Sequence, residues 1–156
     1  MFARFLKLIW RNHEGTALIE GALVIPVLFL LSFGVYEFSW YFYQQQLIQT
    51  GLRDAARYMA RSVDPTAANF NCTTSVASFA TAAQNLATRG TIDATGALRV
   101  SGWTTVTFTC STPAANIYAV TANTNFAEPS LGFLGFLGLP ALTIAVSHQE
   151  RIIGPG

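Results

Sequence analysis

A long apolar run lies near the start of the chain. Residues 21–36 (GALVIPVLFLLSFGVY) contain no charged side chain, and residues 16–19 extend the run, which Glu20 alone interrupts. About twenty helical residues, at roughly 1.5 Å each, cross a hydrocarbon core about 30 Å thick. We therefore expect residues 16–36 to form the transmembrane part of a helix.

The helical period continues beyond the apolar run. Residues that would share one face of a helix recur at steps of three and four as far as Asp64-Pro65, and proline disfavours a helical residue before it. A helix over residues 16–62 would be about 70 Å long, more than a bilayer needs. We expect residues 37–62 to form an exported stem, with this stripe: Phe38, Tyr41, Gln45, Ile48, Leu52, Ala55 and Met59.

The remaining residues, 63–156, have the pattern of a small head domain. Residues 74–89 place apolar residues on one helical stripe, with Thr74 as the expected N-cap and Gly90 after the last turn. Three segments alternate and are rich in Val, Thr and aromatic residues, as strands are: 98–110, 117–126 and 141–147. The predicted fold class is α+β, a long N-terminal helix packed on a head with one further helix and a three-stranded antiparallel sheet.

Charge and composition narrow the function. The chain is 51% hydrophobic and only 11% charged, and 9 Lys and Arg against 8 Asp and Glu give a net charge of +1. A nucleic-acid partner is excluded, because there is no basic excess to neutralise phosphates. The basic residues Arg4, Lys7 and Arg11 precede the run, which places the N-terminus in the cytoplasm and the head outside.

A cleaved secretory signal is the alternative interpretation of this N-terminus. A basic start, an apolar stretch and the small-x-small triplet Ser32 to Gly34 fit such a signal. The run is long, however, and lacks an Ala-x-Ala cleavage site, which favours a retained membrane span.

Glu20 is the residue that needs an explanation. A carboxylate in a bilayer costs a few kcal/mol and marks function. The nearest upstream cation is Arg11, and Glu14 would repel the carboxylate. If the chain were cut after Gly15, the new ammonium at Thr16 would lie about one helical turn from Glu20 and could neutralise it.

The string Gly15-Thr16-Ala17-Leu18-Ile19-Glu20 resembles the processing site of type IV prepilins and pseudopilins. The resemblance implies that residues 1–15 are a leader, that a membrane prepilin peptidase cuts after Gly15, and that Glu20 neutralises a subunit N-terminus during filament assembly.

Residues 17–61 more specifically resemble the TadE-like pseudopilins (minor pilins) of tight-adherence type IV pilus systems. The similarity includes Pro26, the pair Glu37-Phe38 and the cluster Ala55 to Tyr58, and the C-terminal stretch LGFLGFLGLPALTIAVSHQE is also similar. Gly21 departs from the family, which usually has an aromatic residue there. The resemblance implies a single-pass protein of the bacterial inner membrane with a periplasmic head, incorporated into a pilus or its tip. The implied partners are the prepilin peptidase, other pilin-like subunits, the pilus assembly platform and the lipid bilayer.

Other residues are candidates for assembly contacts. Pro26 is expected to shape the helix. Arg53, Arg57 and Arg61 fall four apart with only Asp54 nearby, which predicts either a solvated face or contact with an acidic surface of a neighbouring subunit. Residues 131–140 (LGFLGFLGLP), with Phe133 and Phe136, either cap the sheet or form an exposed subunit interface.

Two cysteines complete the candidate sites. Cys72 and Cys110 lie on the exported side, where a disulfide persists, so we expect one between them. The rival interpretation, a reactive thiol, lacks a Cys-x-x-Cys spacing.

No catalytic or metal-binding motif is present, so we expect no enzyme, metal or cofactor. The two histidines, His13 and His148, lie at opposite ends of the chain, and no phosphate loop or nucleophile motif occurs. The exported acids are scattered: Asp64, Asp93, Glu128 and Glu150. Two alternatives to a pseudopilin stay open. One is a non-polymerising, membrane-anchored structural or adhesion module, and the other is an envelope enzyme whose active site no sequence motif reveals.

Overall fold

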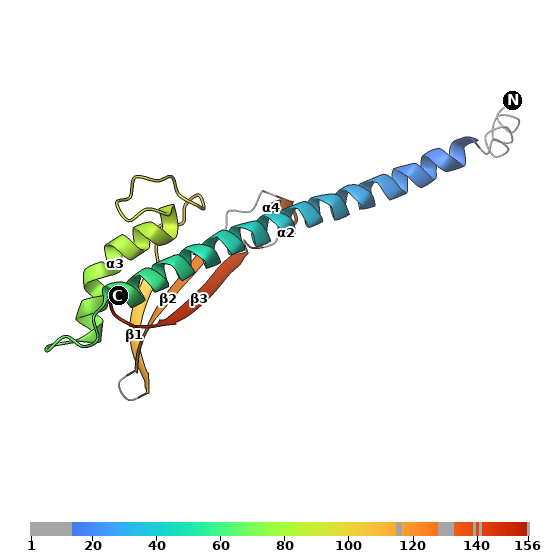
Figure 1. Ribbon diagram of the computed structural model, residues 1–156. Helices are drawn as coiled ribbons and strands as arrows, with labels where there is room; N and C mark the ends of the chain where they lie inside the picture. Colours follow the sequence, from blue (N-terminus) through green and yellow to red (C-terminus); the bar gives the residue numbers. More distant parts are fainter. Residues whose placement is uncertain (1–13, 115–116, 128–132, 139, 141, 156) are drawn as a thin grey trace, which may run out of the picture. The chain divides into compact units, whose positions relative to one another are not determined.

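The computed structural model describes residues 14–114, 117–127, 133–138, 140 and 142–155. The described elements follow one another along the chain as two helices, two strands, a short helix and a last strand (Figure 1). They are α2 (Glu14–Ser62), α3 (Cys72–Arg89), β1 (Thr107–Ala114), β2 (Ile117–Ala127), α4 (Phe133–Phe136) and β3 (Thr143–Arg151). The predicted α+β class, with a long helix, one further long helix and a three-stranded antiparallel sheet, is confirmed.

The chain forms two compact units, residues 1–39 and residues 40–156, here called unit 1 and unit 2. Helix α2 is continuous over 49 residues and contributes to both. It also runs through Pro26 without a break, as helices in membrane spans do when neighbouring groups satisfy the freed carbonyl. The C-terminal part of α2 therefore belongs to the same compact unit as α3 and the sheet.

The core of unit 2 forms around α2. Ile48, Leu52, Ala55 and Met59 are fully buried, so the stripe predicted for the stem is confirmed over these positions. The same core cluster includes residues of α3, residues of the sheet, and Trp103 before β1. Those of α3 and the sheet are Val76, Ala83, Ala87, Val120, Ala122 and Ile144. Burial of this apolar surface is the main force that holds unit 2 together.

Helices α2 and α3 approach each other closely at Gly51. A Cβ atom added to Gly51 would collide with the carbonyl oxygen of Ala87 and lie 2.9 Å from the indole of Trp103. Trp103 is 1% exposed. Its Nε1 donates a hydrogen bond to the Thr124 hydroxyl at 3.1 Å, and that hydroxyl donates to the carbonyl of Thr105 at 2.8 Å. The missing side chain of Gly51 thus makes room for both α3 and Trp103.

Helix α3 begins earlier than predicted. Asn71 is its N-cap, with extended backbone (φ −126°, ψ 112°) and a side-chain oxygen that accepts from the backbone N–H of Thr74. The prediction of Thr74 as N-cap is therefore wrong, because Thr74 already lies inside the first turn. The end is confirmed, since Gly90 adopts φ 81° and its N–H donates to the carbonyl of Leu86.

The sheet has the order β1-β2-β3, with both pairs antiparallel. The prediction of a strand over 98–106 is wrong, and β1 instead runs from Thr107 to Ala114. Gly102 has a positive φ of 81°, and the N–H of Arg99 donates to the carbonyl of Thr88. These features turn the segment back toward α3 and away from a strand ladder.

Strand β3 begins two residues later than predicted and extends to Arg151, because its last residues still pair with β2 through Ala119 and Arg151. Beyond it, the N–H groups of Ile153 and Gly154 both donate to the carbonyl of Ala60. The chain after β3 therefore supplies hydrogen bonds to the last turn of α2, whose carbonyls have no partner within the helix.

Replacing Gly51 with Ala is predicted to lower the free energy of unfolding by about 1–3 kcal/mol, because the added methyl group forces α3 and Trp103 apart. Thermal unfolding of the full chain in detergent, followed by circular dichroism, measures the change. The matched control is Gly34→Ala on the same helix. Gly34 has no heavy atom within 4 Å of the added Cβ, so the control is expected to be neutral or to gain up to about 1 kcal/mol of helix propensity. Equal effects of the two substitutions would contradict the close helix crossing.

Candidate functional site

The expected processing string lies at the start of α2. Gly15 is the second residue of the helix, is exposed, and has no heavy atom within 4 Å of an added Cβ. Thr16 and Glu20 are exposed and one helical turn apart. The greater part of the expected leader, residues 1–13 with Arg4, Lys7 and Arg11, lies outside the described residues.

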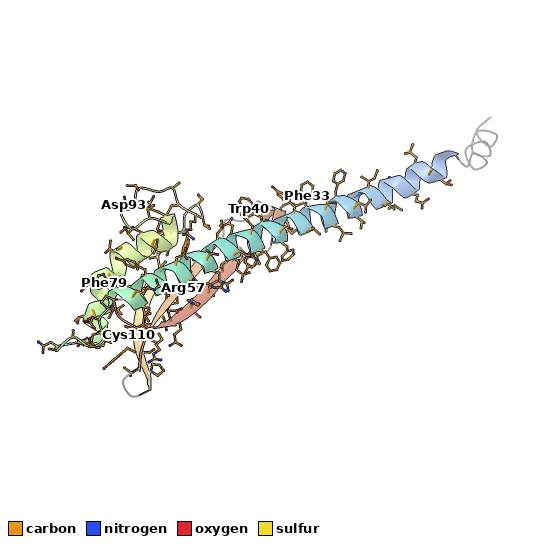
Figure 2. The ribbon with its side chains drawn as sticks, viewed as in Figure 1. Phe33, Trp40, Arg57, Phe79, Asp93 and Cys110 are labelled. Carbon is orange, nitrogen blue, oxygen red and sulfur yellow. A yellow bond between two sulfur atoms is a disulfide. The ribbon has the colours of Figure 1, made fainter. Side chains whose placement is uncertain are left out.

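Glu20 belongs to an apolar helix surface. It is the one charged residue between Thr16 and Tyr36, and large apolar side chains around it are more than half exposed, including Ile19, Leu23 and Phe29. Figure 2 labels one of this set, Phe33, which is 52% exposed. The Glu20 carboxylate has no hydrogen bond or ion pair in the part of the chain that the structure describes. This surface satisfies the length and composition of a membrane span.

The arginine row on α2 is exposed. Arg53, Arg57 and Arg61 all face solvent in the described structure, and Figure 2 labels Arg57 on this helix. Asp54, the nearby acid, instead pairs with Arg99 at 2.9 Å. Asp54 therefore holds the loop after α3 against α2 and leaves the charge of the row without this partner.

The apolar loop places at least one large side chain in solvent. Phe136, at the end of α4, is 86% exposed, and Leu137 after it is 43% exposed. The side chain of Phe133 lies outside the described residues. The exposure of these two side chains favours an exposed surface over a cap at 136 and 137, and a subunit interface there stays a prediction.

Cys72 and Cys110 form a disulfide that joins the first residue of α3 to β1. Their Cα atoms are 5.9 Å apart, within the usual range for bridged cysteines. The sequence separation is 38 residues, for which chain entropy predicts a stabilisation of about 4 kcal/mol. The bridge is therefore a large contribution to the stability of unit 2.

The described acids of residues 63–156 lie apart from one another, and Glu128 lies outside the described residues. Asp64 accepts hydrogen bonds from the hydroxyl and N–H of Thr66, and these bonds lower the pKa of its carboxyl. Asp93 does the same with Thr95, which likewise lowers its pKa. Glu150 accepts from His148, its neighbour on β3, at 3.2 Å. Among the described residues, no group of three or more His, Cys, Asp or Glu side chains could hold a metal ion.

One groove of about 500 Å³ lies between α3 and β1. Its lining is uncharged and consists of threonines and small or apolar residues: Thr73, Val76, Ala77, Ala80, Val106, Thr107, Phe108, Thr109 and Cys110. An active site needs convergent polar groups with matched pKa values, and this lining supplies hydroxyl groups alone.

The sequence patterns do not identify three residues that hold α2 against α3 and the loop after it. Gly51 shows no special spacing, and the pattern that predicts a strand includes Trp103, which instead lies in a buried turn. Arg99 was also assigned to that strand, and its partner Asp54 lies 45 residues away. The small residues Gly51 and Ala87 were the one signal in the sequence that could have indicated a close helix crossing.

Comparison with known families gives one match. Residues 15–57 match the family model described as TadE-like protein. Over this segment the chain is similar to that family. The match begins at Gly15, the residue before the expected cleavage point, and ends at Arg57 on the stem, so it includes Glu20, Pro26 and two of the three arginines in the row. Helix α3, the sheet and α4 lie outside it. No curated protein and no solved structure matches the chain.

Proposed function

We propose that this protein is a minor pilin, or pseudopilin, of a tight-adherence type IV pilus. The observation that carries the proposal is the single carboxylate of Glu20 in an exposed apolar helix surface, within a segment that matches the TadE-like family. In this proposal residues 1–15 are the leader, residues 16–36 span the membrane, residues 37–62 are the stem, and residues 63–156 are the head.

The apolar half of α2 has two successive environments in this mechanism. The bilayer first covers its exposed side chains. In the described structure, no other part of the chain buries the most apolar part of this helix. During assembly the helix leaves the bilayer and packs against helices of other pilin-like subunits. Contacts with lipid are thereby exchanged for van der Waals contacts with protein.

Cleavage after Gly15 supplies the partner of Glu20. The prepilin peptidase would create an ammonium group at Thr16, and the Glu20 carboxylate of one subunit would pair with the ammonium of its neighbour. A buried charge is tolerated only when it is matched, so this pair fixes how far one helix is shifted along another. The family usually has an aromatic residue after the Glu, and this chain has Gly21 there. Cleavage of this chain would therefore show how far the peptidase requires the aromatic residue.

The compartments follow from the same arrangement. Basic residues before the span keep the N-terminus in the cytoplasm, and the head is exported to the periplasm. The Cys72–Cys110 disulfide is consistent with that oxidising side of the inner membrane. The pilus assembly platform would extract the processed chain from this position.

The arginine row supports a contact between subunits above the membrane. Arg53 and Arg57 are exposed and their neighbour Asp54 is engaged by Arg99. Like charges four residues apart repel each other along a helix. An acidic surface on a neighbouring subunit would relieve that repulsion, and Phe136 would add an apolar contact outside the helix.

Mass spectrometry of the native protein tests the processing step. The expected mature chain begins at Thr16, because cleavage after Gly15 provides the ammonium that Glu20 requires. Gly15→Val serves as the control, since a larger residue at the cleavage point is expected to leave the chain starting at Met1. A wild-type protein that starts at Met1 and still joins a filament would contradict the proposal. The same start without filaments would favour a non-polymerising membrane anchor.

Replacing Glu20 with Leu tests the assembly step. Membrane insertion and cleavage are expected to be retained, because Leu is apolar and leaves Gly15 and Thr16 unchanged. Incorporation into sheared filaments is expected to fall more than tenfold, because the ammonium of a neighbour then has no carboxylate and an unmatched charge costs a few kcal/mol. Glu20→Asp keeps the charge and is the matched control, with partial assembly. Normal incorporation of Glu20→Leu would show that the carboxylate has another role.

A further inference from the structure

Among the described residues of unit 2, the exposed large apolar side chains are concentrated at one end. Ile92 and Ile153 are exposed singly elsewhere, and the remaining ones belong to the first turn of α2 in this unit or to the end of α4. They are Trp40 (38% exposed), Phe42 (57%), Tyr43 (56%), Phe136 (86%) and Leu137 (43%). We call these five residues the apolar end.

The two segments of the apolar end, on α2 and at the end of α4, both lie near the start of β3. The hydroxyl of Tyr41 donates to the carbonyl of Thr143, the first residue of β3, at 3.3 Å. Helix α4 ends seven residues before Thr143. Within unit 2, Figure 1 draws α4 at the end where β3 begins, and Figure 2 labels Trp40 at that end. Two chain segments thus bring aromatic side chains to the same end of the unit.

This end carries no charge in either segment. Residues 38–52 contain no Asp, Glu, Lys or Arg, and neither do residues 129–147. Trp and Tyr are enriched at the boundary between hydrocarbon and water, where the ring is apolar and its polar atom is hydrated. Exposed apolar side chains gathered at one end of a unit, without charge in their segments, are typical of a surface that contacts lipid or protein.

The position of this end along helix α2 favours lipid over protein as its contact. Trp40 follows the last residue of the apolar run, Tyr36, by four residues in one unbroken helix, which is about 6 Å of rise. When residues 16–36 span a bilayer, Trp40 and Tyr43 lie at its surface. The bilayer is therefore the apolar surface that this end meets first, before any other subunit arrives.

We propose that Phe136 and Leu137 insert into the interfacial layer of the membrane, on the exported side, while the chain is stored in the bilayer. The contact is a second attachment in addition to the transmembrane helix, and its ligand is the acyl and glycerol region of phospholipids. It rests on the proposed membrane placement of residues 16–36. Its consequence is that extraction of the subunit must release α4 from lipid as well as the helix.

Spin-label accessibility in vesicles tests this proposal. The full processed chain is reconstituted into vesicles of phosphatidylethanolamine and phosphatidylglycerol, and a nitroxide is attached to one introduced cysteine at a time. The two natural cysteines are joined in a disulfide, so labelling without a reductant reaches only the introduced thiol. Phe136→Cys is the test position and Leu137→Cys its repeat. Ile92→Cys, which is 53% exposed and outside the apolar end, is the matched control, and Leu28→Cys reports the span.

Collision rates with oxygen and with a water-soluble nickel chelate, present on both sides of the vesicle, locate each label. We expect oxygen to collide more often than nickel at positions 28, 136 and 137, and the order to reverse by several fold at position 92. Nickel-accessible labels at 136 and 137 with an oxygen-accessible label at 28 would overturn this inference and leave the membrane placement intact. A nickel-accessible label at 28 would overturn both. Dipolar broadening at 136 that disappears on dilution with unlabelled chain would show a contact between subunits instead, and would also overturn the proposal.

Discussion

The proposed assembly depends on a single carboxylate in an apolar surface. Glu20 lies in a helix segment whose other side chains suit hydrocarbon, and within the described residues it has no ionic partner. Burying such a group in a bilayer costs free energy. A positive charge from outside this chain's fold would therefore stabilise it. Cleavage one helical turn upstream would create that charge at the place where neighbouring helices meet. In the proposed function, the register between subunits and the need for a leader would both follow from this one electrostatic requirement.

The second constraint is that one helix serves two environments. Helix α2 exposes apolar side chains in unit 1 and buries Ile48, Leu52 and Met59 in the core of unit 2. The burial in unit 2 uses small residues, since Gly51 allows the backbone of α3 to approach, and the disulfide holds α3 to β1. The hydrogen bonds from Ile153 and Gly154 to Ala60 complete the last turn. These contacts anchor the C-terminal half of α2 to the head, so that the apolar half remains available for lipid or for other subunits.

The patterns that were readable in the sequence were those with local physical causes. The stem helix followed from its period, the end of α3 from Gly90, and β2 from alternation, and the structure agrees at each. The β-rich composition of segment 98–106 predicts a strand. The strand does not form because the chain turns at Gly102 and because Arg99 donates a hydrogen bond to Thr88 in α3. Asn71 and Thr74 are both good N-caps, and only the backbone geometry distinguishes them. For the site, Glu20 stood out because it interrupts an apolar run, whereas the Asp54–Arg99 pair and the burial of Trp103 depend on tertiary contacts that no local pattern encodes.

The pairing of Glu20 with a neighbour's N-terminus is the central claim, and solid-state NMR of assembled filaments measures it directly. Filaments are grown from an equal mixture of chains labelled with ¹⁵N at the Thr16 amine and chains labelled with ¹³C at the Glu20 carboxylate. Because each label is on a different chain, any dipolar coupling between them reports contact between subunits. The account predicts a coupling that corresponds to a distance of about 3–4 Å. Its absence from mixed filaments, with coupling found only when both labels are on one chain, would contradict the account.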